Sequence, residues 1–359
     1  MMNEYLYNYA LKFRRRVLPS RLVFFITNKC NLFCKHCFYQ KQLNKSLEEL
    51  SVSEIEKISF SLAKVYTLLI SGGEPFLRTD LPEICKIFYK QNGTKTIYIP
   101  TNGILKERIL SMSENIAKRC KDCQIIIGVS LDGPREQNDS IRGVGTFDIV
   151  LKNLPSICEI KKRFKNVSVN ICTTIFDRGY SDTMDLFELI KRNTCVSYHA
   201  FSPFRKLTTD NLFSPPTYEN WLKITNDLSK LDKYYFIKAK EKGIRLRCHA
   251  LIKKYVYNII TESLNNKKWP FQCLAGHLFG VIEPNGDIRM CEASNVIGNL
   301  RESEYNFKEI WFSQKAKITK KQIKDGVISK CRHCTYGCSL IPSLIRSPIS
   351  LFKALTGLY

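Results

Sequence analysis

The sequence predicts an α/β fold in which six strand–helix units form a partial (β/α)6, TIM-like barrel, followed by a small cysteine-rich domain. The first observation is that short apolar runs alternate with stretches of helical periodicity through residues 21–212. Six such repeats with buried strands indicate parallel pairing, and right-handed crossovers wind the sheet one way. The second observation is that glycine-containing polar motifs follow the strands, where barrel folds carry their chemistry.

Each repeat has its own local signals. We expect strands over residues 22–26, 67–70, 96–99, 124–131, 167–175 and 195–201. Helices are expected over 53–63, 81–91, 106–119, 147–163 and 183–192, and two further helices over 221–242 and 251–264. Ser53 is the expected N-cap of the first helix, with Glu56 at the reciprocal position of a capping box. Asn92 and Gly93 are expected to end the second helix.

These elements divide the chain into five segments. Residues 1–20 form a leader with a basic turn at 12–16, and residues 21–212 form the barrel. Residues 213–270 open with prolines and form a helical linker, and residues 271–340 are rich in cysteine. The tail, residues 341–359, is amphipathic and basic, so it either packs on the body as a helix or contacts a membrane surface.

Composition limits the cellular context. The 359 residues contain no apolar run of the roughly 18–20 residues that a membrane span needs. The N-terminus lacks the charged start and apolar core of a signal peptide, so we expect a cytoplasmic protein. Fifteen cysteines in such a protein favour metal or redox chemistry over disulfides.

The chain is strongly basic, with a net charge of +23 that is spread along its whole length. A lysine-rich overall composition would explain this charge without any partner. The functional alternatives are an acidic peptide, a nucleic acid or a membrane surface. No nucleic-acid-binding module is visible, which makes nucleic acid the weakest of these alternatives.

Three cysteines follow the first expected strand closely. Cys30, Cys34 and Cys37 have the spacing Cys-x3-Cys-x2-Cys. Three thiolates on one loop can hold three corners of an iron–sulfur cube and leave one iron open, as catalytic metal sites do. Half of a zinc site, or three buried thiols, is the simpler alternative.

This loop, with the aromatic-type residue His36 before Cys37, resembles the cluster loop of radical S-adenosylmethionine (radical SAM) enzymes. Four further stretches match that family in order: 71–75 (SGGEP), 100–103 (PTNG), 130–134 (SLDGP) and 139–143 (DSIRG). The resemblance implies the same barrel and a [4Fe–4S] cluster that binds S-adenosylmethionine (SAM). It also implies an electron donor such as ferredoxin or flavodoxin, and a 5′-deoxyadenosyl radical that abstracts hydrogen from a substrate.

The resemblance also assigns cofactor-binding residues. The stretch Gly72, Gly73, Glu74 and Pro75 would hold the amino group of SAM, because glycines allow a close backbone approach and a carboxylate accepts from an ammonium. Arg142 would hold the carboxylate of SAM in a bidentate fork, and a surface salt bridge is the alternative. His36, Asn102 and Ser130 would complete the site, with Asn102 and Ser130 near the ribose or in structural turns.

A second set of cysteines lies in the C-terminal segment: Cys273, Cys291, Cys331, Cys334 and Cys338. Their order resembles the SPASM domain of radical SAM enzymes, or its shorter twitch form. Because the full SPASM pattern has seven or more cysteines, we expect one auxiliary [4Fe–4S] cluster on the first four. Cys338, or Cys248 in its place, remains an alternative ligand, and a zinc site is the alternative metal centre.

Two assignments are weaker. Glu292 follows Cys291 where some SPASM enzymes have a carboxylate that accepts a substrate proton, so it is the candidate catalytic base. Cys120 and Cys123 have metal-like spacing, but they lie at the opposite end of the barrel, and we expect their role to be structural or incidental.

The leading interpretation is therefore a radical SAM oxidoreductase that modifies a peptide or protein side chain. Small-molecule biosynthesis, of a cofactor, haem-type compound, sugar or lipid, is the alternative within the class. A basic surface and an amphipathic tail would favour such an anionic substrate. The alternative from another class is a non-enzymatic iron–sulfur redox sensor.

Overall fold

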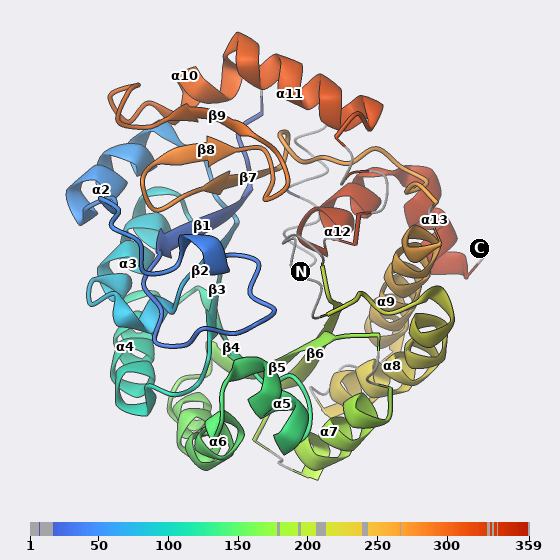
Figure 1. The fold of residues 1–359 in the computed structure, drawn as a ribbon. Helices are drawn as coiled ribbons and strands as arrows, with labels where there is room; N and C mark the ends of the chain where they lie inside the picture. The colour runs from blue at the N-terminus through green and yellow to red at the C-terminus, as the bar shows by residue number, and fades with distance from the viewer. Residues whose placement is uncertain are drawn as a thin grey trace.

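The computed structural model describes residues 7, 17–177, 180–192, 195–205, 213–238, 243–265, 267–328, 331, 334, 335 and 337–357. Most of the predicted leader, including its basic turn, therefore lies outside the described residues. A curved sheet occupies the centre of the molecule, and helices surround its outer side (Figure 1). Among the described residues, no helix combines the length and apolar composition needed to cross a membrane.

Six parallel strands form the barrel part of the sheet and confirm the predicted α/β fold. They are β1 (Arg21–Thr27), β2 (Thr67–Gly72), β3 (Thr96–Thr101), β4 (Gln124–Ser130), β5 (Val167–Ile175) and β6 (Tyr198–Pro203). Each pairs in parallel with the next along the chain. The last strand runs from Tyr198 to Pro203, so it begins and ends later in the sequence than the predicted range 195–201.

The cysteine-rich segment continues this sheet on the other side of β1. Strand β7 (Phe279–Ile282) pairs in parallel with β1, and β8 (Asp287–Arg289) and β9 (Val296–Asn299) follow in antiparallel order. The complete order is β6-β5-β4-β3-β2-β1-β7-β8-β9. One hydrophobic core runs through both parts, from the barrel strands to the fully buried Trp311. The two segments are thus parts of one sheet and one core.

Helices cover the outer side of the barrel strands, and their apolar faces are buried. They are α2 (Val52–Ser61), α3 (Leu81–Gln91), α4 (Lys106–Arg119), α6 (Thr146–Arg163) and α7 (Tyr180–Arg192). Three short elements follow strand ends: η2 (Gln40–Gln42), η3 (Pro75–Leu77) and α5 (Arg135–Arg142). The sequence-based prediction missed α5, whose polar sequence has few apolar positions.

The predicted start of α2 was wrong by two residues. Ser51, and not Ser53, is the N-cap, and it forms a capping box with Glu54. Both serines have a glutamate three residues later, so the local sequence allowed either box. Distant contacts favour Glu54, because Arg301 Nε lies 2.7 Å from its Oε1 and the Tyr305 hydroxyl donates to it at 2.9 Å.

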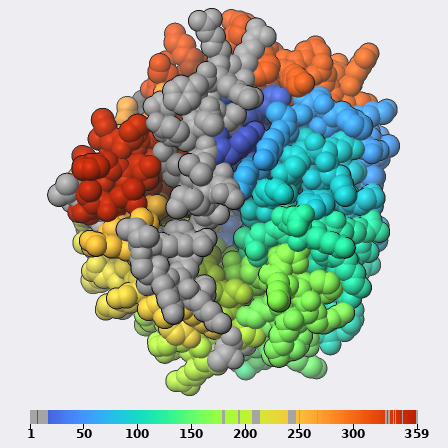
Figure 2. Space-filling view, turned by 180° about the vertical axis from the view of Figure 1, so that it is seen from behind, coloured from blue at the N-terminus to red at the C-terminus, as the bar shows by residue number. Residues whose placement is uncertain are grey.

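The remaining helices form two groups. Helices α10 (Phe307–Phe312) and α11 (Gln314–Asp325) follow β9, and α8 (Tyr218–Lys238) and α9 (Gly243–Leu264) pack on each other beyond β6. The tail forms α12 (Gly337–Arg346) and α13 (Pro348–Thr356). Helix α13 packs on α9 (Figure 2), in agreement with the first of the two alternatives for the tail. Its outer face exposes Ile349 and Phe352.

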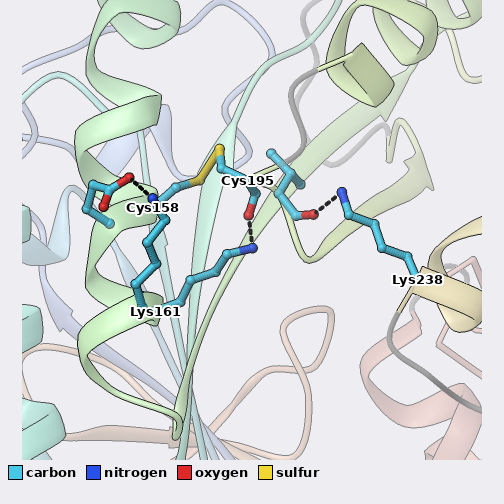
Figure 3. Close-up of a disulfide and its surroundings, with 7 residues drawn as sticks. Cys158, Lys161, Cys195 and Lys238 are labelled. Carbon is cyan, nitrogen blue, oxygen red and sulfur yellow. Dashed lines mark hydrogen bonds and ion pairs between the residues drawn. A yellow bond between two sulfur atoms is a disulfide. The ribbon is translucent and has the colours of Figure 1, made fainter.

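One disulfide departs from the expectation that the cysteines avoid such bonds. Cys158 of α6 is bonded to Cys195, which lies just before β6 (Figure 3). Their Cα atoms are 5.6 Å apart, within the range that a disulfide can bridge. Lys161 Nζ donates to the carbonyl of Cys195, and Lys238 Nζ donates to the carbonyl of Val196 at 3.1 Å. These contacts connect the residues just before the edge strand β6 with α6 and α8.

Candidate functional site

The first candidate site is the loop after β1 that carries Cys30, Cys34 and Cys37. A turn closes the loop, because the Cys37 amide donates to the carbonyl of Cys34 at 3.0 Å. The amide of Lys35 donates to the carbonyl of Ile141 at 2.9 Å and ties the loop to α5. All three cysteines line one pocket of about 240 Å³, whose other walls include the ends of β2, β3, β4, β5 and β6.

The two glycines after β2 fit closely against the base of this loop. A Cβ atom on Gly72, which has a φ of +109°, would collide with the carbonyl oxygen of Thr27, and one on Gly73 would collide with that of Lys29. The amides of Gly73 and Glu74 donate to these same two oxygens, each at 2.8 Å. The glycines therefore position the cysteine loop, and their predicted contact with SAM stays a prediction.

Glu74 joins the ends of β2 and β3 from a buried position. Its Oε1 accepts from Phe76 N at 3.2 Å and from Thr101 Oγ1 at 2.9 Å, and its Oε2 accepts from Asn102 N at 2.8 Å. Burial raises the pKa of Glu74 to about 7, and these three donors oppose the shift. Pro75 begins η3 directly after it and is also buried. The carboxylate thus holds two walls of the pocket together.

The guanidinium of Arg142 is engaged by a second buried carboxylate. Its Nε and Nη2 each lie 2.7 Å from Asp132 Oδ2, while Oδ1 accepts from Thr174 N at 2.7 Å. Its Nη1 lies 3.9 Å from Cys34 Sγ. Burial alone would raise the pKa of Asp132, but the charges of Arg142 and His36 lower it. The fork predicted for the carboxylate of SAM is therefore bound to Asp132, and Nη1 is directed to the cysteine loop.

The other predicted cofactor residues lie in the same pocket. His36 Nε2 lies 3.3 Å from Asp132 Oδ2, and its Nδ1 is buried without a hydrogen-bond partner in the part of the chain that the structure describes. Asn102 donates from Nδ2 to Asn31 Oδ1 at 2.8 Å, which connects β3 to the cysteine loop. Ser130 lines the pocket at the end of β4. The structure thus brings all of these residues together.

The donor set fits a [4Fe–4S] cluster with one open iron. Burial raises the pKa of Cys30 and of Cys37 to about 11, and it also raises the pKa of Cys34. The thiols are therefore protonated at neutral pH unless a metal displaces their protons. Three thiols leave one iron for a further ligand. The unpartnered His36 Nδ1 and the surrounding pocket provide polar groups and space for that ligand.

Four cysteines of the C-terminal segment share a second cavity. Cys273, Cys291, Cys331 and Cys334 line a space of about 160 Å³ whose other walls contain both apolar side chains and charged ones. Trp269 Nε1 donates to the carbonyl of Cys334 at 2.8 Å and fixes one side of it. Burial raises the pKa of Cys291 to about 12 and that of Cys331 to about 11. Four thiols match the complete ligand set of one auxiliary cluster.

The two alternative ligands differ in position. Cys338 lies on α12, and its side chain is outside the described residues, so its role as a ligand stays a prediction. Cys248 lies on α9 and does not line the four-cysteine cavity. Cys120 and Cys123 are fully buried in the barrel core, where burial raises the pKa of each thiol to about 12. This position agrees with the structural role expected for that pair.

Glu292 lies between the two sites. It follows Cys291, and its Oε2 is 3.1 Å from Nη1 of Arg205. Arg205 follows β6 and lines the pocket of the three-cysteine loop, and its guanidinium lies 5.8 Å from the centre of the Phe38 ring. One ion pair therefore connects the wall of the first pocket with the residue next to Cys291, which lines the second cavity. The predicted role of Glu292 as a base stays a prediction.

Sequence reasoning missed three residues of the site. Asp132 lies inside a matched motif, but nothing in the motif shows that it engages Arg142. Asn31 sits between two of the cysteines and gave no separate signal. Arg205 follows the last barrel strand, and only the register of that strand places it in the pocket.

Comparisons with known proteins agree with this geometry. Residues 24–192 match the model of the Radical SAM superfamily, and residues 273–335 match SPASM, an iron–sulfur cluster-binding domain. Fe-coproporphyrin III synthase of Methanosarcina barkeri is 34% identical over 199 residues, which are 51% of this chain and 47% of that protein. AdoMet-dependent heme synthase of the same organism is 26% identical over 340 residues, or 89% of both chains.

A bacteriocin biosynthesis protein and a solved structure also match. The subtilosin biosynthesis protein AlbA of Bacillus subtilis is 25% identical over 90% of this chain and 68% of its own. The crystal structure of Streptococcus suis SuiB has a TM-score of 0.60 at 17% identity and covers 90% of this chain and 71% of that chain, which shows a common fold. With a three-cysteine loop, a second four-cysteine site and both family matches, the chain belongs to the radical SAM superfamily and is an enzyme with an additional SPASM domain.

Proposed function

We propose that this enzyme abstracts a hydrogen atom from an organic substrate in the first pocket, that of the three-cysteine loop. The substrate radical then gives one electron to the second site, that of the four cysteines in the SPASM segment. The ion pair between Arg205 and Glu292 carries the proposal, because it joins the wall of the first pocket to the residue next to Cys291. A substrate in the first pocket would therefore lie beside residues of the second site. That adjacency supports an oxidation in which both sites take part.

The residues of the chain have distinct parts in this proposal. Cys30, Cys34 and Cys37 would hold the first cluster, which with SAM supplies a 5′-deoxyadenosyl radical when both are bound. Asp132 orients Arg142 toward the cysteine loop. The buried residues Glu74, Thr101 and Asn102, which follow β2 and end β3, shield the pocket from water on their side. The four cysteines of the SPASM segment would hold the electron acceptor.

For the substrate we propose an anionic small molecule of the porphyrin class. The heme synthase relative supports this choice because it aligns over 89% of both chains. The net charge of +23 favours an anionic partner. A peptide or protein side chain, the first choice from sequence alone, is the second candidate, because the bacteriocin biosynthesis protein AlbA aligns over 90% of this chain. The family match favours either enzyme over a redox sensor.

The test compares the two substrates under the same conditions. Anaerobic enzyme is reconstituted with iron and sulfide, reduced with dithionite and given SAM with Fe-coproporphyrin III or with a synthetic peptide encoded beside the gene. We expect the porphyrin to increase 5′-deoxyadenosine and to appear as a product of altered mass. A modified peptide with an unchanged porphyrin would favour the second candidate. Absence of deoxyadenosine from enzyme with its first cluster intact would contradict the proposal itself.

Two partner assignments, an electron donor and a membrane surface, remain predictions within this proposal. A cytoplasmic ferredoxin or flavodoxin would supply the electron for SAM cleavage. The tail helix α13 exposes Ile349 and Phe352, 73% and 61% exposed, beside Lys353, which agrees with a peripheral membrane contact. Vesicle sedimentation with anionic lipid would show whether the tail binds a membrane.

A further inference from the structure

Apart from the cysteines, the titratable side chains among the described lining residues of the first pocket are Glu74, Arg142, His36 and Arg205. Glu74 is held by three hydrogen bonds from the protein, and Arg142 is bound to the buried Asp132. These groups are fixed by partners that are themselves buried. Arg205 differs, because its ion-pair partner Glu292 comes from the SPASM segment and also lines a neighbouring cavity.

The geometry of this pair allows an exchange of partners. The Arg205 side chain is 29% exposed and that of Glu292 is 10% exposed, so water reaches the pair. Phe38 lies under the guanidinium at 5.8 Å and supports its position independently of Glu292. The neighbouring cavity, of about 330 Å³, is lined by Lys45 as well as by Arg289, which is paired with Glu283. A carboxylate that left Arg205 would therefore share this cavity with the ammonium group of Lys45.

We propose that Arg205 binds a carboxylate of the substrate and that Glu292 occupies the same guanidinium until the substrate arrives. A guanidinium presents paired donors that match a carboxylate, which makes arginine suited to this recognition. One carboxylate replaces another, so the exchange changes neither the charge of the pair nor any covalent bond. This inference rests on the proposed anionic small-molecule substrate and specifies the group by which it is recognised.

The exchange gives opposite predictions for the two partners. Removal of the guanidinium removes the binding group, whereas removal of the Glu292 charge removes its competitor. Arg205→Met should therefore weaken binding of a carboxylate ligand, and Glu292→Gln should tighten it. A catalytic base at Glu292 predicts something else, namely loss of product without tighter binding.

The experiment measures binding of Fe-coproporphyrin III and of its tetramethyl ester to reconstituted, SAM-loaded enzyme by anaerobic absorbance titration. We expect the acid to bind more tightly than the ester. Arg205→Met should weaken binding of the acid about ten- to a hundredfold, the range for a lost hydrogen bond to a charged group. Glu292→Gln should increase the affinity for the acid several-fold, and neither variant should change the affinity for the ester.

Two further variants separate recognition from a purely structural link. Arg301→Met removes another ion pair between the barrel and the C-terminal segment, that with Glu54, at a similar exposure of 25%. It should leave the affinity for the acid unchanged. The double variant Arg205→Glu/Glu292→Arg restores opposite charges across the same two elements. It should not restore binding of the acid if Arg205 binds the substrate carboxylate. It should restore binding if the ion pair only connects the barrel with the SPASM segment.

The outcomes distinguish this inference from the proposed function. Equal binding of the acid by wild type and Arg205→Met, or recovery in the charge-swapped variant, would overturn the exchange while leaving a porphyrin substrate in place. Failure of the wild type to bind the acid, with deoxyadenosine formation intact, would overturn both the exchange and the porphyrin class. The radical SAM assignment would stand in either case.

Discussion

At the scale of single residues, buried carboxylates organise the first site. Asp132 holds Arg142 and His36, and Glu74 holds the ends of two strands. Both carboxylates accept hydrogen bonds from backbone amides, which fixes the loops around the pocket. The residues that the family resemblance assigns to SAM therefore also stabilise the protein. Substitutions at these positions will affect stability and cofactor binding together.

Glu74→Gln removes the carboxylate at the β2–β3 junction and keeps the size of the side chain. The amide has one acceptor oxygen, so at least one of the donors on Phe76, Thr101 and Asn102 loses its partner. We expect the free energy of unfolding to fall by about 1–3 kcal/mol, the cost of a buried unsatisfied group, and SAM affinity to fall as well. Urea unfolding and equilibrium dialysis with SAM measure the two effects.

The matched control is Glu83→Gln on α3, where the carboxylate is 37% exposed and pairs with Lys86 and Arg119. Exposed ion pairs contribute about 0–1 kcal/mol, so this variant should keep near-normal stability. An equal decrease in the free energy of unfolding in both variants would show that the hydrogen bonds of Glu74 stabilise the protein no more than an exposed ion pair does.

At the scale of elements, α11 carries a partly buried cation. Lys320 Nζ donates to the carbonyl of Trp311 at 3.1 Å and lies 4.9 Å from the centre of its ring. Burial lowers the pKa of Lys320 from 10.5 to about 8. The folded state therefore releases this proton at a lower pH than the unfolded state. Below about pH 8 the folded protein bears the whole cost of the buried charge.

This shift predicts a pH-dependent difference between wild type and Lys320→Met. Between about pH 8 and 10.5 the unfolded chain keeps the proton that the folded chain has lost, so wild-type stability rises with pH. The variant lacks this group, so the unfolding free energy of wild type should increase relative to that of Lys320→Met across this range. Urea unfolding of both proteins at pH 7.5 and pH 10 tests the sign, and a difference that is independent of pH would contradict it.

At the scale of the whole molecule, the SPASM segment and the barrel share one sheet. The edge of β1 that β7 covers includes Leu22 and Val23, which are 0% and 3% exposed. A chain that ends at residue 270 would lose β7 and Trp311 from the common core and would expose an apolar strand edge. We expect this chain to aggregate and to lack a cooperative unfolding transition in size-exclusion and circular-dichroism measurements. A soluble monomer with cooperative unfolding would contradict a shared core.

Much of this architecture could be predicted from the sequence because its signals are local. The alternation of apolar runs and helical stretches predicted every barrel strand, and the ranges of α3, α4 and β5 agree with the prediction. The spacing of Cys30, Cys34 and Cys37 predicted the first site for the same reason. The start of α2 was wrong because two capping boxes were equally possible locally, and Arg301 favours one of them from a distance.

The remaining features depend on long-range pairing that no short stretch contains. The parallel pairing of β1 with β7 joins segments about 250 residues apart, and the ion pair of Arg205 with Glu292 depends on it. Cys158 lies on α6 and Cys195 precedes β6, 37 residues later in the sequence, and only the folded chain brings them together. Such contacts follow from the folded sheet and not from motif spacing.

The most direct test counts iron and SAM cleavage in one anaerobic experiment. Reconstituted, dithionite-reduced enzyme should convert SAM to 5′-deoxyadenosine, and the Cys30→Ala/Cys34→Ala/Cys37→Ala variant should form none. The variant should retain about four irons, held by the second set of cysteines, because four thiols bind one cluster. About eight retained irons would mean a second auxiliary cluster with further ligands. Absence of deoxyadenosine from wild type with its first cluster intact would contradict radical SAM chemistry in this protein.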